Sequence, residues 1–175
     1  MKIKAKDINL ALDKLKPSIA KRTIGAVDSN DLLHICKFVA DMILKRTRLG
    51  FGVRDNGEKR EKLAELKGRP KPYKSTIQRR ETLKERGQLS SETTPTKSNL
   101  TMTGQMLNAI SYKVKKLGGI IFIKDSTRKD GKNTNKEIAE YVSKNRPFFH
   151  LSDSEIRQLK REAVKLVRSK LKNGR

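Results

Sequence analysis

The central part of the chain, residues 49–100, lacks the regular spacing of large apolar side chains that a packed helix or strand requires. It contains five glycines and three prolines, which interrupt regular elements. A structureless loop of this length is not expected inside a compact domain unless it is functional or becomes ordered on a partner. We therefore predict a basic arm that packs on something, with short helices over residues 59–66 and 75–85. Residues 1–48 and 101–175 would then build a single core.

Two amphipathic helices are predicted ahead of the arm. Apolar residues at helical spacing indicate the first over residues 7–21. A stronger pattern indicates a second helix that begins with Ser29 or Asp31 as its N-cap and ends in a basic turn at residues 45–48. Cys36 is the only cysteine and lies on the apolar face of this second helix, where a free thiol packs as a small hydrophobic group.

Regular patterns return after the arm. Thr103 is expected to cap a short helix. The apolar face of that helix would be formed by Met106, Leu107 and Ile110. Residues 112–123 then alternate apolar residues with lysine and finish in an apolar run. With Gly118 and Gly119 as the turn, this pattern predicts a β-hairpin.

The C-terminal region is predicted to end in a long helix. Residues 137–142 fit either a short helix or the approach to a strand, and the pattern does not separate the two. Residues 146–149, Arg-Pro-Phe-Phe, form a short apolar plug, and Ser152 with Glu155 three residues later forms a capping box. The buried stripe of the last helix consists of Ile156, Leu159, Ala163, Leu166, Val167 and Leu171. These elements predict an α+β fold with N-terminal helices, a small antiparallel hairpin, a long C-terminal helix and an extended basic arm.

Charge is the second constraint on the chain. It has 42 Lys and Arg residues against 19 Asp and Glu residues, which gives a formal net charge of +23. Such a charge repels other copies of the chain and attracts polyanions, so nucleic acid is the first partner to consider. For any single lysine, a solvated helix face is the more frequent explanation. The arm holds thirteen basic and seven acidic residues, so the excess is spread over the helices as well.

Few residues are candidates for catalysis. His34 and Cys36 lie two positions apart on a predicted helix, so their side chains point about 200° apart and cannot pair. His150 follows two phenylalanines and precedes a helix cap, which favours a packing or capping role. The chain has no cluster of His, Cys or carboxylates at metal-ligand spacing, and no Gly-rich loop followed by Lys and Ser or Thr. We expect no enzyme activity, no catalytic or metal-binding residue and no cofactor.

The sequence predicts no membrane contact. No stretch approaches the roughly 20 apolar residues that a membrane span needs. Residues 1–9 alternate Lys with Ile and Asp and do not form the apolar run of a secretory signal. We expect a protein that is made and used in a cytosol.

Two motifs carry a resemblance to a known family. Residues 98–107, Ser-Asn-Leu-Thr-Met-Thr-Gly-Gln-Met-Leu, precede Ile110 and the hairpin, and residues 146–149 precede the last helix. In this order the chain resembles the tail-completion, or neck, proteins of tailed bacteriophages. In that family a Leu-Thr-x-Thr-Gly-x-Leu stretch begins a helix, a β-hairpin follows, and an Arg-Pro-Phe element leads into the last helix. The resemblance covers residues 98–171, and residues 39–48 more loosely, while the basic arm departs from shorter family members.

The resemblance implies a subunit that forms a ring, usually of six copies, at the head-to-tail joint of a virion, after assembly in the host cytoplasm. Its partners would be connector or adaptor proteins, tail-tube proteins and the double-stranded DNA that passes through. The fold and assembly motif would consist of Thr103, Gly104, Pro147, Phe148 and Phe149. The candidates for contact with neighbours or DNA are Arg46, Arg48, Arg79 and Arg80.

An independent basic nucleic-acid-binding protein is the alternative. The sequence has no zinc-finger spacing and no aromatic-rich strand of the kind that stacks RNA bases. Residues 75–86 gather basic side chains that could neutralise several phosphates, and a solvated arm explains them equally well. The mass of the protein in solution, with and without DNA, separates the two functions.

Overall fold

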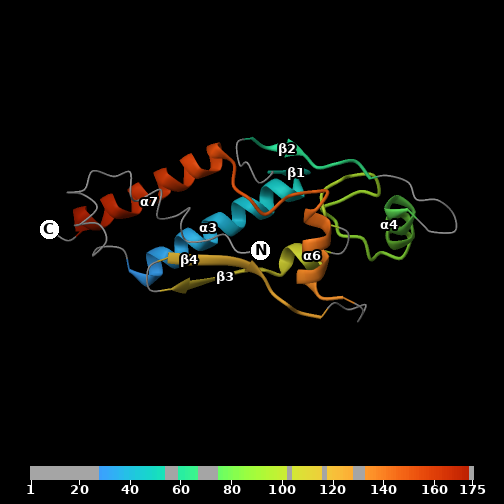
Figure 1. Ribbon diagram of the computed structural model, residues 1–175, viewed down its shortest axis with the longest axis horizontal. Helices are drawn as coiled ribbons and strands as arrows, with labels where there is room; N and C mark the ends of the chain where they lie inside the picture. Colours follow the sequence, from blue (N-terminus) through green and yellow to red (C-terminus); the bar gives the residue numbers. More distant parts are fainter. Residues whose placement is uncertain are drawn as a thin grey trace.

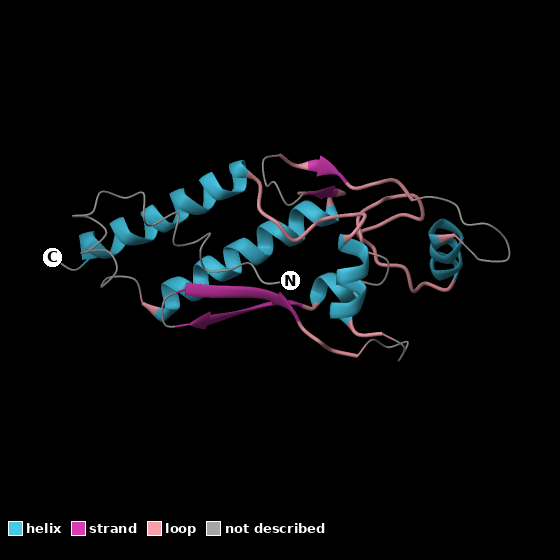
Figure 2. Ribbon diagram, viewed as in Figure 1, coloured by secondary structure: helices cyan, strands magenta, loops and turns pink. Residues whose placement is uncertain are grey.

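The computed structural model describes residues 28–53, 59–66, 75–101, 104–115, 118–127 and 133–173. Helices and two small antiparallel sheets make up these residues, which confirms the predicted α+β class (Figure 1, Figure 2). The long C-terminal helix α7, Asp153–Asn173, lies alongside α3, Ser29–Arg48, and the hairpin packs on α3 as well. The helix predicted over residues 7–21 lies outside the described residues.

Helix α3 begins after Asp28, so neither Ser29 nor Asp31 is its N-cap. The Asp28 carboxylate accepts hydrogen bonds from the backbone N–H groups of Asn30 at 2.8 Å and Asp31 at 2.9 Å. The Asp31 carboxylate accepts one from the backbone N–H of Asp28 at 2.9 Å. Asp31 therefore completes a capping box from inside the helix. Several neighbouring residues can cap a helix, and the extended backbone at Asp28 decides which of them does.

The predicted hairpin consists of β3, Ile110–Lys115, and β4, Gly118–Ile123, which pair antiparallel. Gly118 and Gly119, predicted as the turn, belong to β4 instead. Gly119 is needed where the hairpin meets α3, because a Cβ atom at this position would lie 1.9 Å from the Sγ atom of Cys36. This glycine therefore allows the strand to pack closely on the helix.

Two short helices flank the hairpin. Helix α5, Gln105–Asn108, is a single turn with Met106 and Leu107 buried, and Ile110 begins β3 instead of continuing the helical face. Helix α6, Asn135–Ser143, decides the choice left open for residues 137–142 in favour of a helix. Thr134 caps α6, since its Oγ1 accepts from the Glu137 N–H at 3.2 Å while the Glu137 carboxylate accepts from the Thr134 N–H at 2.8 Å.

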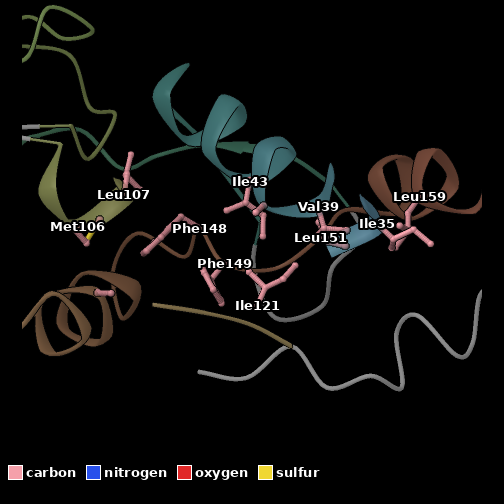
Figure 3. Packing of buried hydrophobic residues seen from close by; sticks show 12 residues of the cluster. Ile35, Val39, Ile43, Met106, Leu107, Ile121, Phe148, Phe149, Leu151 and Leu159 are labelled. Atoms are coloured by element: carbon pink, nitrogen blue, oxygen red, sulfur yellow. The ribbon is translucent and has the colours of Figure 1, made fainter. Parts of the chain in front are cut away.

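One hydrophobic core joins the helices, the hairpin and the segment before α7. Figure 3 shows Phe148, Phe149 and Ile121 gathered along α3. Phe148 and Phe149 pack edge to face with their ring centroids 5.9 Å apart, and both are buried, as predicted for the apolar plug. Leu159 and Val167 of the stripe predicted on α7 are buried as well. The partly buried members of that stripe are Ile156, Ala163 and Leu166, and the side chain of Leu171 lies outside the described residues.

The arm contains more regular structure than an extended segment would. Strand β1, Phe51–Gly52, pairs antiparallel with β2, Glu61–Lys62, so the helix predicted over residues 59–66 is wrong. The backbone N–H of Leu63 donates to the carbonyl of Gly50 at 2.8 Å, which extends the pairing between these two segments. The helix predicted over residues 75–85 is confirmed as α4, Thr76–Glu85, with Ser75 as its N-cap. Helix α4 stands apart from the core (Figure 1).

Ionic contacts hold the start of α3 against the end of α7. The Nζ atom of Lys170 lies 2.6 Å from a carboxylate oxygen of Asp28 and 2.6 Å from one of Asp31. The hydrogen bond from Lys170 lowers the pKa of Asp28 to about 2, and the two carboxylates raise the pKa of Lys170. Nearer the middle of α7, Glu162 lies 3.1 Å from Nε2 of His34.

The close contact between Gly119 and Cys36 predicts a compensating pair of substitutions. Gly119→Ala should lower the free energy of unfolding by about 1–3 kcal/mol, because the new Cβ overlaps the thiol. With Cys36→Ala added, only the Cβ of residue 36 remains, at an ordinary distance of 3.7 Å. The double variant should therefore be more stable in urea than Gly119→Ala alone. If the losses of the two single variants simply added, the contact would not exist.

The lowered pKa of Asp28 predicts a pH-dependent difference between wild type and Asp28→Asn. Asparagine keeps the N-cap but removes the charge that pairs with Lys170, so the variant should be less stable at pH 7. This advantage of the wild type is present above the pKa of an unfolded aspartate, about 3.9. It is lost as the pH falls through the folded pKa of about 2. Urea unfolding curves of the two proteins should converge in acid, and an unchanged difference would contradict the pairing.

Candidate functional site

Residues 146–149 form the junction between the arm and the core. The Arg146 side chain donates from Nε to the carbonyl of Ala64 at 3.0 Å and from Nη2 to the carbonyl of Glu65 at 3.1 Å. The carbonyl of Pro147 accepts a hydrogen bond from the backbone N–H of Val53 at 3.1 Å. Both segments that form the β1–β2 pair are therefore fastened to the residues just before α7. The interface leaves no room for a side chain at Gly52, since a Cβ there would lie 2.0 Å from the Pro147 carbonyl oxygen.

A buried ion pair lies directly behind this junction. The Nη1 atom of Arg46 donates to Oε2 of Glu155 at 2.5 Å, and the two side chains are 2% and 0% exposed. The Nη2 atom of Arg46 donates to the carbonyl of Phe148. Burial lowers the pKa of the Arg46 guanidinium, and the negative charge of Glu155 opposes that shift. The guanidinium thus joins the end of α3 to the junction and to the first turn of α7.

Glu155 has two further partners in the described structure. Its Oε2 atom accepts from the backbone N–H and the hydroxyl of Ser152, both at 2.9 Å, which confirms the predicted capping box. Its Oε1 atom lies 3.3 Å from Nη2 of Arg60 in the arm. The same carboxylate therefore caps α7, balances Arg46 and contacts the arm.

Arg80 organises the second half of the arm. Its Nη1 atom donates to the hydroxyl of Thr93 at 3.3 Å, to the carbonyl of Thr94 at 3.1 Å and to the carbonyl of Lys97. The side chain is buried, and this burial, together with the nearby charge of Arg146, lowers its pKa. The loop after α4 is therefore wrapped around one guanidinium group.

Asn99 is a second buried organiser of this loop, which sequence reasoning did not single out. Its Nδ2 atom donates to the carbonyl of Arg48 at 3.1 Å and to that of Glu92 at 3.0 Å, and its Oδ1 accepts from the Thr93 hydroxyl at 2.7 Å. Asn99 thereby ties the loop to the last turn of α3. A polar residue in a run of polar residues carries no sequence signal of burial.

The four arginines expected to touch neighbours or DNA fall into three different environments. Arg46 and Arg80 are buried with partners within the chain, which does not agree with a surface role. Arg48 is half-buried, with Nε 3.0 Å from the Glu92 carboxylate. Arg79 is exposed on α4 and makes no ion pair with another described residue. Only Arg79 therefore stays a candidate from this set.

The first motif of the resemblance lies at the start of α5. Gly104 precedes this helix with φ 74° and ψ −15°, a left-handed backbone conformation that glycine adopts without strain. Thr103, predicted as the N-cap, lies outside the described residues. Asn108 at the end of α5 accepts a hydrogen bond from Arg48 Nη2 at 3.1 Å. The motif is therefore linked to the end of α3.

The side of the hairpin away from α3 is partly apolar. Ile121 is buried, so its neighbours Ile120 and Phe122 point to the opposite side of the sheet, where both are half-buried. Their cross-strand partners are Lys113 and Ser111, and Lys113 Nζ lies 5.7 Å from the centroid of the Phe122 ring. We name these four residues the outer hairpin face. A hollow beside it is lined by Ile120, Phe122, Phe149, Lys136, Ala139 and Glu140, so it runs from β4 to α6.

Helix α7 carries a row of basic residues on its exposed side. Its members are Arg157, Arg161, Lys165, Arg168 and Lys172, and all are exposed. At 3.6 residues per turn they fall within an arc of about 80°, opposite the side that carries the buried Leu159. We name these residues the α7 basic face. Sequence reasoning did not identify it, because basic residues are common on the solvated face of a helix.

The residues considered for catalysis lie within the described part of the chain. Among all the described residues, no group of three or more His, Cys, Asp or Glu side chains is placed to hold a metal ion. Cys36 is buried, which raises the pKa of its thiol, and His34 contacts Glu162 rather than Cys36. Within the described ranges, no helix has the length and apolar character needed to cross a membrane.

Substitution of the two cationic partners of Glu155 should lower the free energy of unfolding by very different amounts. Arg46→Met leaves the buried carboxylate without its closest counter-charge, and we expect the free energy of unfolding to fall by about 3–5 kcal/mol. Arg60→Met is the matched control, because the Arg60 side chain is 43% exposed, and its loss should be at most about 1 kcal/mol. Urea unfolding followed by circular dichroism measures both. Equal losses would show that Arg46 has no special role.

A scan against protein-family models and searches of the curated proteins and of the solved structures found no match to this chain.

Proposed function

We propose that the chain is a structural subunit of a phage neck or tail terminus, which forms a ring at the head-to-tail joint. The outer hairpin face carries this proposal, because it offers an apolar surface beside a hollow on an otherwise strongly basic protein. Contacts between copies of such a chain need apolar anchors to offset charge repulsion. The motif resemblance gives the location, a virion neck, and the partners, which are connector, adaptor and tail-tube proteins.

The edge of β4 is a second feature that favours a protein contact at this surface. In the described part of the chain β3 and β4 form a two-stranded sheet, so no third strand covers either edge. β3 carries Lys113 and Lys115, whereas β4 has no charged residue between Gly118 and Ile123. Strand edges that stay unpaired are usually protected by charge or proline. β4 therefore suits contact with another subunit better than β3 does.

A closed ring needs two different surfaces on each subunit, one for each neighbour. The arm supplies the second surface in this proposal, because α4 stands apart from the core (Figure 1). Arg146, Arg80 and Asn99 hold the described arm residues through hydrogen bonds to backbone carbonyls. The described residues of the arm therefore reach the neighbour already held in place by contacts within the chain. The exposed Arg79 lies on this projection.

An independent nucleic-acid-binding protein stays the second candidate, because the α7 basic face offers a polyanion site on a single subunit. The two functions differ in what the protein does without DNA. A ring subunit assembles through protein contacts, whereas an independent binder stays monomeric until DNA is added.

Sedimentation velocity of the purified chain, with and without duplex DNA, tests the ring. We expect an assembly of about six copies that does not require DNA. Phe122→Asp should shift the protein to the monomer without lowering its unfolding temperature, since Phe122 lies outside the core cluster. Leu33→Asp is the matched control, because Leu33 is an exposed apolar residue on α3, and this variant should assemble normally.

Two results would overturn the proposal. A wild-type chain that stays monomeric and binds duplex tightly at physiological salt would support the second candidate instead. Unchanged assembly of Phe122→Asp would show that the outer hairpin face is not the contact.

A further inference from the structure

The α7 basic face forms a straight line of positive charge. From Arg157 to Lys172 it covers sixteen residues, or about 22 Å for fifteen steps of 1.5 Å. Within its arc of about 80° the only other residue is Ser154, so the line contains no acidic and no large apolar side chain.

The acidic residues of α7 do not neutralise this line. Glu155 is buried against Arg46, and Glu162 faces His34 on α3. Asp153, in the first turn, lies about 40° outside the arc and makes no ion pair with another described residue. None of the five basic side chains makes an ion pair or a hydrogen bond to another described residue. Lys170 provides the contrast: it lies on a different side of the helix and pairs with Asp28 and Asp31. The five charges are thus available to an external partner.

The composition of the line indicates the class of that partner. Protein interfaces are centred on aromatic and aliphatic anchors and are poor in lysine, and this line has no apolar anchor. Helices that bind anionic lipid surfaces insert an apolar face, and the apolar face of α7 is packed in the core. A phosphate backbone needs only regularly spaced cations, and three of the five are arginines, which bind phosphate through two parallel hydrogen bonds.

We propose that the α7 basic face binds the phosphate backbone of double-stranded DNA without sequence preference. Its length equals about six base-pair steps of 3.4 Å along the duplex axis. This goes beyond the ring, because none of the arginines named from the sequence lies on α7. It also stands independently of the ring, since a single subunit carries the complete line.

Fluorescence anisotropy with a labelled random-sequence duplex, titrated between about 50 and 200 mM salt, measures the binding. Five phosphate contacts predict a slope of log K against log salt near −4.5, at about 0.9 per contact. The triple variant Arg161→Gln, Lys165→Gln, Arg168→Gln should weaken binding at least about tenfold and reduce the slope to about −1.8.

Two sets of variants control this experiment. The triple variant Lys37→Gln, Lys124→Gln, Lys144→Gln removes the same charge from exposed positions outside α7, and it should retain both affinity and slope. Arg161→Lys with Arg168→Lys keeps the charge on α7 and should retain the slope. Circular dichroism checks that every variant is folded.

Several outcomes would overturn the inference. Equal losses in the two triple variants would mean that only net charge matters. Binding of polyglutamate as tight as binding of duplex would assign the face to an acidic protein. If the wild-type chain did not bind duplex at low salt, the proposed DNA site on α7 would be wrong. Sedimentation of the same variants tests the ring proposal separately. A monomer that binds DNA through α7 would contradict only the ring, not the DNA site.

Discussion

Arg46 and Glu155 place opposite charges in the interior, where either charge alone would be strongly unfavourable. The pair is useful for geometry more than for stability, since a well-packed apolar pair can be equally stable. One guanidinium binds Glu155 and the Phe148 carbonyl at once, so the end of α3 and the start of α7 must adopt one relative position. The position of Phe148 and Phe149 in the core follows from that constraint.

The arm is likewise held by polar side chains that contact residues elsewhere in the chain. It has few large apolar residues to bury, so side-chain hydrogen bonds to backbone carbonyls hold it in place. Arg146 donates to the carbonyl of Ala64, Arg80 to that of Thr94 and Asn99 to that of Arg48, which lie 82, 14 and 51 residues away in sequence. Such bonds fix the path of the chain without requiring a regular element. A segment that looks like a linker can therefore carry a defined surface.

The parts of the fold that sequence predicted are those encoded by local patterns. The apolar spacing of α3 and α7, the capping box of Ser152 and Glu155, and the hairpin all follow from neighbouring residues. The pairing of β1 with β2 and the burial of Arg46 and Arg80 depend on partners elsewhere in the chain. Arg46 and Glu155 are 109 residues apart, and a basic residue in a basic helix end looks exposed. Gly119 was read as a turn for the same reason, because its contact with Cys36 is non-local.

Burial of some arginines changes the meaning of the total charge. Arg46 and Arg80 are buried with partners within the chain, so they contribute little to the surface that a partner meets. The α7 basic face, by contrast, keeps its five charges on the described surface. It lies on a different element from the outer hairpin face, with α3 between the two (Figure 1). The two proposed contacts, the hairpin with protein and α7 with DNA, therefore use separate surfaces, so neither needs to displace the other.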